Sequence, residues 1–131
     1  MPDASRMAAT FTRLAAILAP YQPRLVTKTD APGDLYLEAP PSAAYPKGQF
    51  FGAVKIGKRY VSFHLMPVYV HPELLDDISR ELRKRMQGKS CFNFTTIDED
   101  VIDELARLTK AGFGAYQQDG TIPAFHTIAK P

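Results

Sequence analysis

The chain has almost no cysteine, which limits how it can be stabilised. Cys91 is the only cysteine among 131 residues, so no disulfide can form within the chain. It lies in a short apolar strand pattern, where a cysteine usually behaves as a small hydrophobic residue. A chain of this length buries roughly two-thirds of its unfolded surface and needs neither a disulfide nor a metal to fold. We therefore expect a reducing, cytoplasmic setting.

Long apolar runs and a strong excess of one charge are also missing. No segment approaches the roughly 20 apolar residues that cross a bilayer. Asp3 and Arg13 interrupt the N-terminal apolar stretch, which argues against an export signal. Sixteen basic residues nearly balance 14 acidic ones, for a net charge of +2. We therefore expect no membrane and no nucleic-acid partner.

The overall composition, with 45% hydrophobic and 23% charged residues, is typical of one globular domain. We expect this domain to span residues 5–118. Residues 119–131 should form a loosely held tail, because the helical periodicity fades near Asp119-Gly120. The tail residues with the apolar character to dock on a neighbour are Ile122, Phe125 and Ile128.

Two stretches have the periodicity of amphipathic helices. The first starts near Ser5 and ends before Pro20, and its apolar stripe is Phe11, Leu14, Ala15 and Leu18. The second opens with a capping box at residues 96–99, where a Thr hydroxyl and a Glu carboxylate satisfy backbone N–H groups. Its apolar stripe is Val101, Ile102, Leu105, Leu108, Gly112, Phe113 and Tyr116. Both stripes should dock on a sheet.

Between these helices, alternating apolar residues predict strands. Residues 24–30 and 35–39 flank a turn and form a first hairpin, and a proline-rich loop at residues 40–47 leads to a second one. Residues 68–70 are expected to extend that hairpin past a bulge. Two short helices or one kinked helix then precede a returning strand at residues 90–94. The expected class is α+β: one antiparallel sheet of about five strands, with N-terminal, middle and C-terminal helices packed on it.

The second hairpin predicts its own turn and register. Two runs rich in β-branched and aromatic residues flank Gly57-Lys58, and glycine at the first central position suits a type II′ turn. Ile56 then lies opposite Arg59. The pairs facing the core are Val54 with Val61, Gly52 with Phe63, and Phe50 with Leu65. The pairs facing outward are Lys55 with Tyr60, Ala53 with Ser62, Phe51 with His64, and Gln49 with Met66.

The outward face of this hairpin is too polar for a dry interior and too aromatic for plain solvent. We therefore predict a non-catalytic binding module that holds a small ligand or a protein partner there. The candidate ligand-binding residues are Phe51, Tyr60, Ser62, His64 and Met66. The alternative is that a helix covers this face and buries Phe51 and Met66. The sequence is consistent with either a monomer or a homodimer as the oligomeric state.

Catalytic and metal sites have less support in the sequence. A Cys91–His64 nucleophile pair needs a lowered thiol pKa, which no neighbouring residue supplies. The three histidines, His64, His71 and His126, do not share ligand spacing. We therefore expect no catalytic residue and no enzyme activity.

A cluster of acidic residues opens the C-terminal helix. Asp98, Glu99 and Asp103 are weak candidates for binding a hard cation such as iron through oxygen ligands. Helix capping and the helix dipole explain most of these carboxylates without a metal. Iron is therefore the only cofactor that the pattern leaves open.

Three segments together resemble the YdhG-like family of small bacterial domains of unknown function. They are FFGAVKIGKRYVSFHLMPVY, the helical stretch after it, and GKSCFNF followed by IDEDVIDEL, so that the similarity covers residues 24–116. The resemblance implies an antiparallel sheet with helices packed on it and a bacterial cytosolic setting. Some relatives carry an iron-chaperone label by likeness to frataxin. The resemblance therefore implies an alternative function: an iron-binding chaperone that uses the acidic helix starts.

Overall fold

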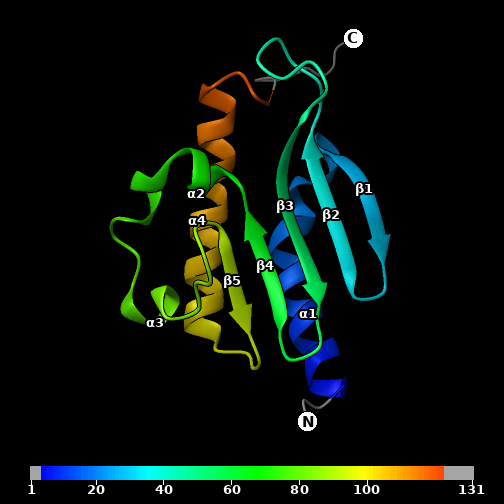
Figure 1. Cartoon of the computed structure of the whole chain (residues 1–131), viewed down its shortest axis with the longest axis vertical. Helices are drawn as coiled ribbons and strands as arrows, with labels where there is room; N and C mark the ends of the chain where they lie inside the picture. Colours follow the sequence, from blue (N-terminus) through cyan, green and yellow to red (C-terminus); the bar gives the residue numbers. More distant parts are fainter. Residues whose placement is uncertain (1–3, 123–131) are drawn as a thin grey trace.

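Alternating apolar residues build a five-stranded antiparallel sheet in the computed structural model, which describes residues 4–122 (Figure 1). Neighbouring strands in the sheet are also neighbours in the sequence. The strands are β1 (Val26–Ala31), β2 (Asp34–Ala39), β3 (Gln49–Ile56), β4 (Val61–Leu65) and β5 (Cys91–Phe94). The predicted α+β class and the five-stranded antiparallel sheet are confirmed.

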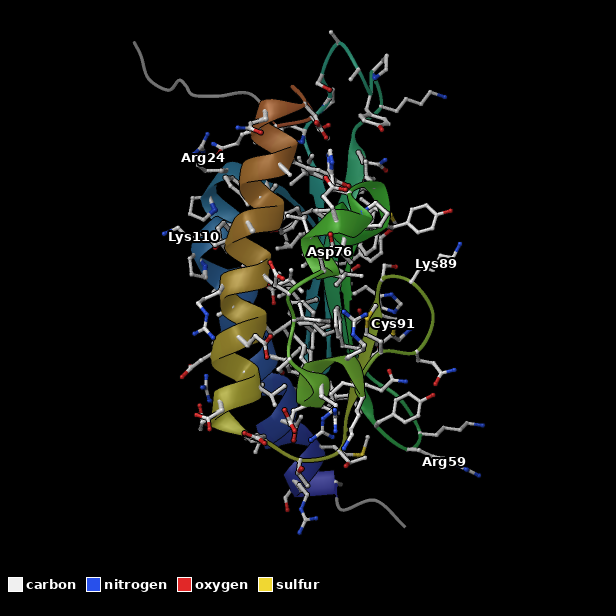
Figure 2. The ribbon with its side chains drawn as sticks, turned by 90° about the vertical axis from the view of Figure 1, so that its left-hand side faces the viewer. Arg24, Arg59, Asp76, Lys89, Cys91 and Lys110 are labelled. Carbon is white, nitrogen blue, oxygen red and sulfur yellow. The ribbon has the colours of Figure 1, made fainter. Side chains whose placement is uncertain are left out.

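Two long helices cover one face of this sheet. They are α1 (Ala4–Leu18) and α4 (Glu99–Gln118), and Figure 2 shows them together on one side of the strands. All seven residues of the predicted α4 stripe are buried. In α1 the buried residues are Met7, Thr10, Leu14, Ile17 and Leu18. Within residues 4–122, no helix combines the length and the apolar character that spanning a membrane requires.

The start of α4 differs from the predicted capping box. The N-cap is Asp98, two residues after the predicted Thr96. Its carboxylate accepts hydrogen bonds from the backbone N–H groups of Asp100 and Val101, at 3.1 and 3.5 Å. An aspartate caps a helix as well as a threonine does, so either residue is able to start the helix. Asp98 therefore has a structural task at this position.

The segment between β4 and β5 forms short helices beside the sheet (Figure 1). They are α2 (Pro67–Val70), the 3-10 turn η2 (Pro72–Leu75) and α3 (Arg80–Arg83), and the 3-10 turn η1 (Ala19–Arg24) follows α1. The expectation that residues 68–70 extend the strand was wrong. Pro67 lacks an N–H group and fixes φ, which suits the first position of a helix better than a ladder.

The outer edge of β5 is paired with the segment after α3. The Asn93 N–H group donates to the Arg85 carbonyl and the Gln87 N–H group to the Cys91 carbonyl, both at 2.8 Å. These bonds satisfy backbone groups that a bare edge strand leaves open to other chains.

The hairpin between β3 and β4 has a different register from the predicted one. Gly57 does not adopt a positive φ, so the type II′ turn does not form. The chain reverses one residue later, and the Gly57 N–H group donates to the Tyr60 carbonyl at 2.9 Å. The observed pairs are Ile56 with Val61, Val54 with Phe63, and Gly52 with Leu65. Because each partner moves by two residues, the predicted inward side chains of β4 still face the core.

A β-bulge in β3 overturns the prediction for its two adjacent phenylalanines. Leu37 pairs with Gly52, but the next residue, Glu38, pairs with Phe50, so Phe51 is an extra residue in β3. Such an extra residue changes which face the neighbouring side chains occupy. Phe51 is therefore fully buried on the helix face, and Phe50 points outward.

Contacts with α4 hold this bulge in place. The Phe51 ring packs edge-on against Phe113 and Tyr116, with both pairs of ring centroids 5.8 Å apart. The Tyr116 hydroxyl donates to the Phe50 carbonyl at 2.8 Å, and the Met66 N–H group donates to the Phe51 carbonyl at 2.9 Å. Burial raises the pKa of Tyr116, so its hydroxyl remains a proton donor. Both carbonyls of the bulge are thus satisfied.

The packed domain extends further than residue 118. Thr121 and Ile122 are 2% and 1% exposed, and the N–H groups of both donate to the Tyr116 carbonyl. Gly120, with a φ of 78°, turns the chain back onto the end of α4. A loose tail from residue 119 was therefore the wrong expectation for residues 119–122. Phe125, His126 and Ile128 lie outside the described residues.

Two glycines of α4 should respond oppositely to alanine. A Cβ atom at Gly112 would lie 2.9 Å from the Pro67 Cβ atom of α2, whereas a Cβ atom at Gly114 meets nothing within 4 Å. Gly114→Ala should raise the free energy of unfolding by about 0.5–1 kcal/mol through helix propensity. Gly112→Ala should lower it by about 1–2 kcal/mol, because overpacking outweighs that gain. Urea denaturation measures both, and stabilisation by both variants would contradict the α2–α4 contact.

Candidate functional site

The sheet face opposite α1 and α4 carries a hollow of about 340 Å³. This outer face is turned toward the viewer in Figure 1, where the described helices lie behind or beside the strands. Among the described residues, no helix covers this outer face, contrary to the alternative that the sequence left open. The volume lies at the lower end of the range of about 300–1,000 Å³ that small-molecule sites occupy. The hollow is therefore the candidate site.

One side of the hollow is an aromatic wall, formed by Tyr36, Phe50 and His64 from β2, β3 and β4. The Tyr36 and Phe50 rings stack, with centroids 4.8 Å apart and an interplanar angle of 22°. The His64 ring is tilted by 57° to the Phe50 ring, with 6.4 Å between centroids. Ala53 lies between Tyr36 and His64 in the sheet register and is too small to fill the space. The wall can therefore contact a planar ring.

The rest of the lining is polar and comes from Thr29, Asp34, Lys55 and Ser62. Asp34 and Lys55 are register partners on β2 and β3, so opposite charges lie side by side on the outer face. In the described part of the chain, the ion pairs are Arg13 with Glu99 and His71 with two carboxylates. Both charges in the hollow are therefore available to a ligand.

The five residues predicted for this site divide between four places. Ser62 and His64 line the hollow, as neighbours on β4. Phe51 is buried on the opposite face because of the bulge. Tyr60 is in the hairpin turn, 40% exposed, and does not line the hollow, and Met66 is half-buried against the core where α2 begins. The predicted groove residues are thus brought together only in part.

Sequence reasoning missed the contribution of β2 to the site. Asp34 and Tyr36 point outward because the alternating residues Leu35 and Leu37 are buried. This alternation was visible in the sequence. Placing these two residues beside Lys55 also required the β2–β3 register, which local periodicity does not contain.

His64 lies directly opposite Cys91 in the β4–β5 ladder (Figure 2 labels Cys91). Leu65 and Ser90 form the hydrogen-bonded pair next to them, so the His64–Cys91 pair is of the close, non-hydrogen-bonded kind. Burial lowers the pKa of His64 and raises the pKa of the Cys91 thiol. Both shifts favour the neutral groups, so the thiol is not activated as a nucleophile.

Two of the three acidic candidates for iron, Asp98 and Glu99, are occupied by structural contacts. Asp98 caps α4, and Glu99 forms a bidentate ion pair with Arg13 of α1. Asp103 lies near enough to Arg13 to help raise the pKa of that guanidinium, after the larger effect of the Glu99 hydrogen bond. Between residues 4 and 122, no three His, Cys, Asp or Glu side chains gather where a metal ion would fit. Iron binding stays a prediction.

A second histidine joins distant parts of the chain. The Nε2 atom of His71, after α2, lies 2.6 Å from the Oδ2 atom of Asp119 at the end of α4. Its Nδ1 atom lies 3.3 Å from a carboxylate oxygen of Glu73. The Asp119 hydrogen bond is the main reason that the pKa of His71 is raised, and Glu73 adds to it. The sequence could not predict this contact, because 48 residues separate His71 from Asp119.

The two histidines should titrate on opposite sides of the ordinary pKa of 6.5. His64 should lose its proton at lower pH because it is partly buried, and His71 at higher pH because carboxylates flank it. The pH dependence of the imidazole Cε1–H shifts in NMR spectra measures both values. A pKa for His64 above that of His71 would contradict the geometry.

Stability should follow the same linkage. His71 stabilises the fold fully below its unfolded pKa of about 6.5, and this contribution disappears as the pH rises through the raised folded pKa. His71→Gln should therefore lower the melting temperature by about 1–3 °C at pH 6 and have little effect at pH 9. An equal loss at both values would show that charge is not involved.

Comparison of the chain with protein-family models, with curated proteins and with solved structures gives no match. The resemblance to the YdhG-like family therefore stays a prediction from sequence motifs. The functional proposal depends on the geometry of the hollow.

Proposed function

We propose that this protein is a non-catalytic binding module that holds a small aromatic molecule in the outer-face hollow. One observation carries the proposal: an aromatic wall stands beside two opposite charges that lack ion-pair partners in the described chain. Ligand sites characteristically combine apolar walls with a few well-placed polar groups. An open strand face with a purely structural task would not need this combination.

The composition of the surface favours a small molecule over a protein partner. Protein interfaces place aromatic residues at their centre and exclude charges from it. Here Asp34 and Lys55 are part of the lining itself. The large apolar residues that are exposed lie elsewhere: Val26, Tyr60, Tyr69, Val70 and Ile97. Among the described residues, the large exposed apolar side chains therefore do not line the hollow.

The lining supports binding and not catalysis. Among the described residues, His64 supplies the only imidazole that lines the hollow, and the Ser62 hydroxyl donates to the Lys55 carbonyl instead of to His64. A nucleophile needs a base within hydrogen-bond reach, and this pair does not provide one.

The biological setting that we propose is the bacterial cytosol. It rests on the single unpaired Cys91 and on the motifs that resemble the YdhG-like family. The iron-chaperone alternative has less support, because Asp98 caps α4, Glu99 binds Arg13, and the described residues contain no group of three side chains that could hold a metal ion.

A fragment titration tests the proposed function. A library of small aromatic compounds is added to the ¹⁵N-labelled protein, and amide shifts are followed by NMR. We expect compounds that shift Tyr36, Ala53, Lys55 and His64 together. Ser62→Tyr should abolish these shifts by filling the hollow.

The matched control is Asn93→Tyr. Asn93 pairs with Ser62 on the neighbouring strand β5 but does not line the hollow, so this variant should bind as the wild type does. The proposal fails if no compound shifts the lining, or if Ser62→Tyr leaves the shifts intact. Binding of a folded protein partner across the whole face, with no small compound bound, would also overturn it.

A further inference from the structure

The two charges in the hollow are arranged for a ligand that carries both signs. Asp34 and Lys55 are direct register partners, and adjacent strands lie about 4.8 Å apart. The two groups therefore begin from neighbouring backbone positions and point to the same side of the sheet. A ligand whose ammonium and carboxylate groups are close together can approach both at once.

The remaining lining adds no net charge. Burial lowers the pKa of His64, so its imidazole is neutral at pH 7. Thr29, Ser62 and the aromatic rings are uncharged, and Asp34 and Lys55 cancel. A ligand with only a negative charge would be attracted by Lys55 but repelled by the Asp34 carboxylate. A ligand with only a positive charge would be attracted by Asp34 but repelled by Lys55. Like charges placed together discriminate against the wrong ligand.

The aromatic wall supplies the second element of recognition. Tyr36 and Phe50 form a stacked pair that borders the same hollow as the two charges. Aromatic rings that pack together attract each other by more than the area that they bury accounts for. A ligand in which a flat ring is attached to an ammonium group and a carboxylate would contact the aromatic wall and the two charged side chains together.

We infer that the hollow binds a zwitterionic aromatic compound of the α-amino-acid type. This inference rests on the proposed function of the hollow as a small-molecule site. The ring contacts the wall of Tyr36 and Phe50, the carboxylate pairs with Lys55, and the ammonium group pairs with Asp34.

A second hollow limits how the test can be designed. Asp34 and Lys55 also border a depression toward α1, whose lining includes Phe11 and Ile56. A ligand there would sense the same two charges. Ser62 lines only the outer-face hollow of these two, so Ser62→Tyr distinguishes between them.

The absence of tryptophan from the chain provides a clean readout. Four indole compounds serve as probes: L-tryptophan with both charges, tryptamine with the ammonium group only, 3-indolepropionate with the carboxylate only, and indole with neither. The anisotropy of indole fluorescence, excited where tyrosine does not absorb, reports binding directly. We expect L-tryptophan to bind about three to ten times more tightly than either singly charged compound, as partly exposed charge pairs allow.

Two substitutions assign the charges. Lys55→Met should weaken L-tryptophan and 3-indolepropionate by about three- to tenfold and leave indole unchanged. Asp34→Asn should weaken L-tryptophan and tryptamine in the same way. Lys58→Met in the hairpin turn and Asp77→Asn before α3 are the matched controls and should change nothing. Circular dichroism checks that each variant is folded.

The possible failures are distinguishable. Equal binding of all four indoles, lost in Ser62→Tyr, would overturn the zwitterion inference and leave the proposed function standing. The same holds if other fragments bind the hollow and no indole compound does. Binding that is sensitive to Asp34→Asn and Lys55→Met but not to Ser62→Tyr would place the ligand in the second hollow and overturn the inference.

Discussion

The bulge at Phe51 is the constraint on which the rest of the structure depends. In a regular strand, Phe51 would share the outer face with Lys55. The extra residue turns it inward, where it is fully buried. Burying such a side chain is worth roughly 1.5–3 kcal/mol, whereas one disturbed ladder hydrogen bond costs about 1 kcal/mol. The Tyr116 hydroxyl, which bonds the Phe50 carbonyl, reduces that cost further.

The candidate site follows from the same bulge. As Phe51 turns toward the helices, Phe50 turns outward and stacks on Tyr36. Both long helices lie on the opposite face, so the stacked rings stay accessible beside Asp34 and Lys55 (Figure 1). Core packing and the aromatic wall are thus two results of one backbone irregularity. Disturbing the bulge should affect the stability of the domain and the shape of the hollow together.

Local patterns predicted the elements well and their partners less well. The stripe of α4 and the inward residues of β4 follow from periodicity alone, and both are buried. The hairpin register was wrong by two residues, an error that exchanges partners but preserves the faces. The bulge was out of reach, because it depends on Tyr116, 66 residues after Phe50. The hollow was predicted on the correct face, but one of the three rings of its wall, Tyr36, comes from β2, and placing it there required the β2–β3 register.

The most direct test of this account is the solvent exposure of the two adjacent phenylalanine rings. A soluble gadolinium chelate relaxes protons in proportion to their access to solvent, and NMR measures this effect on each assigned ring. The account requires strong relaxation of Phe50 and His64, and protection of Phe51 equal to that of Phe63 in the core. Strong relaxation of Phe51 together with protection of Phe50 would contradict the bulge and, with it, the aromatic wall of the site.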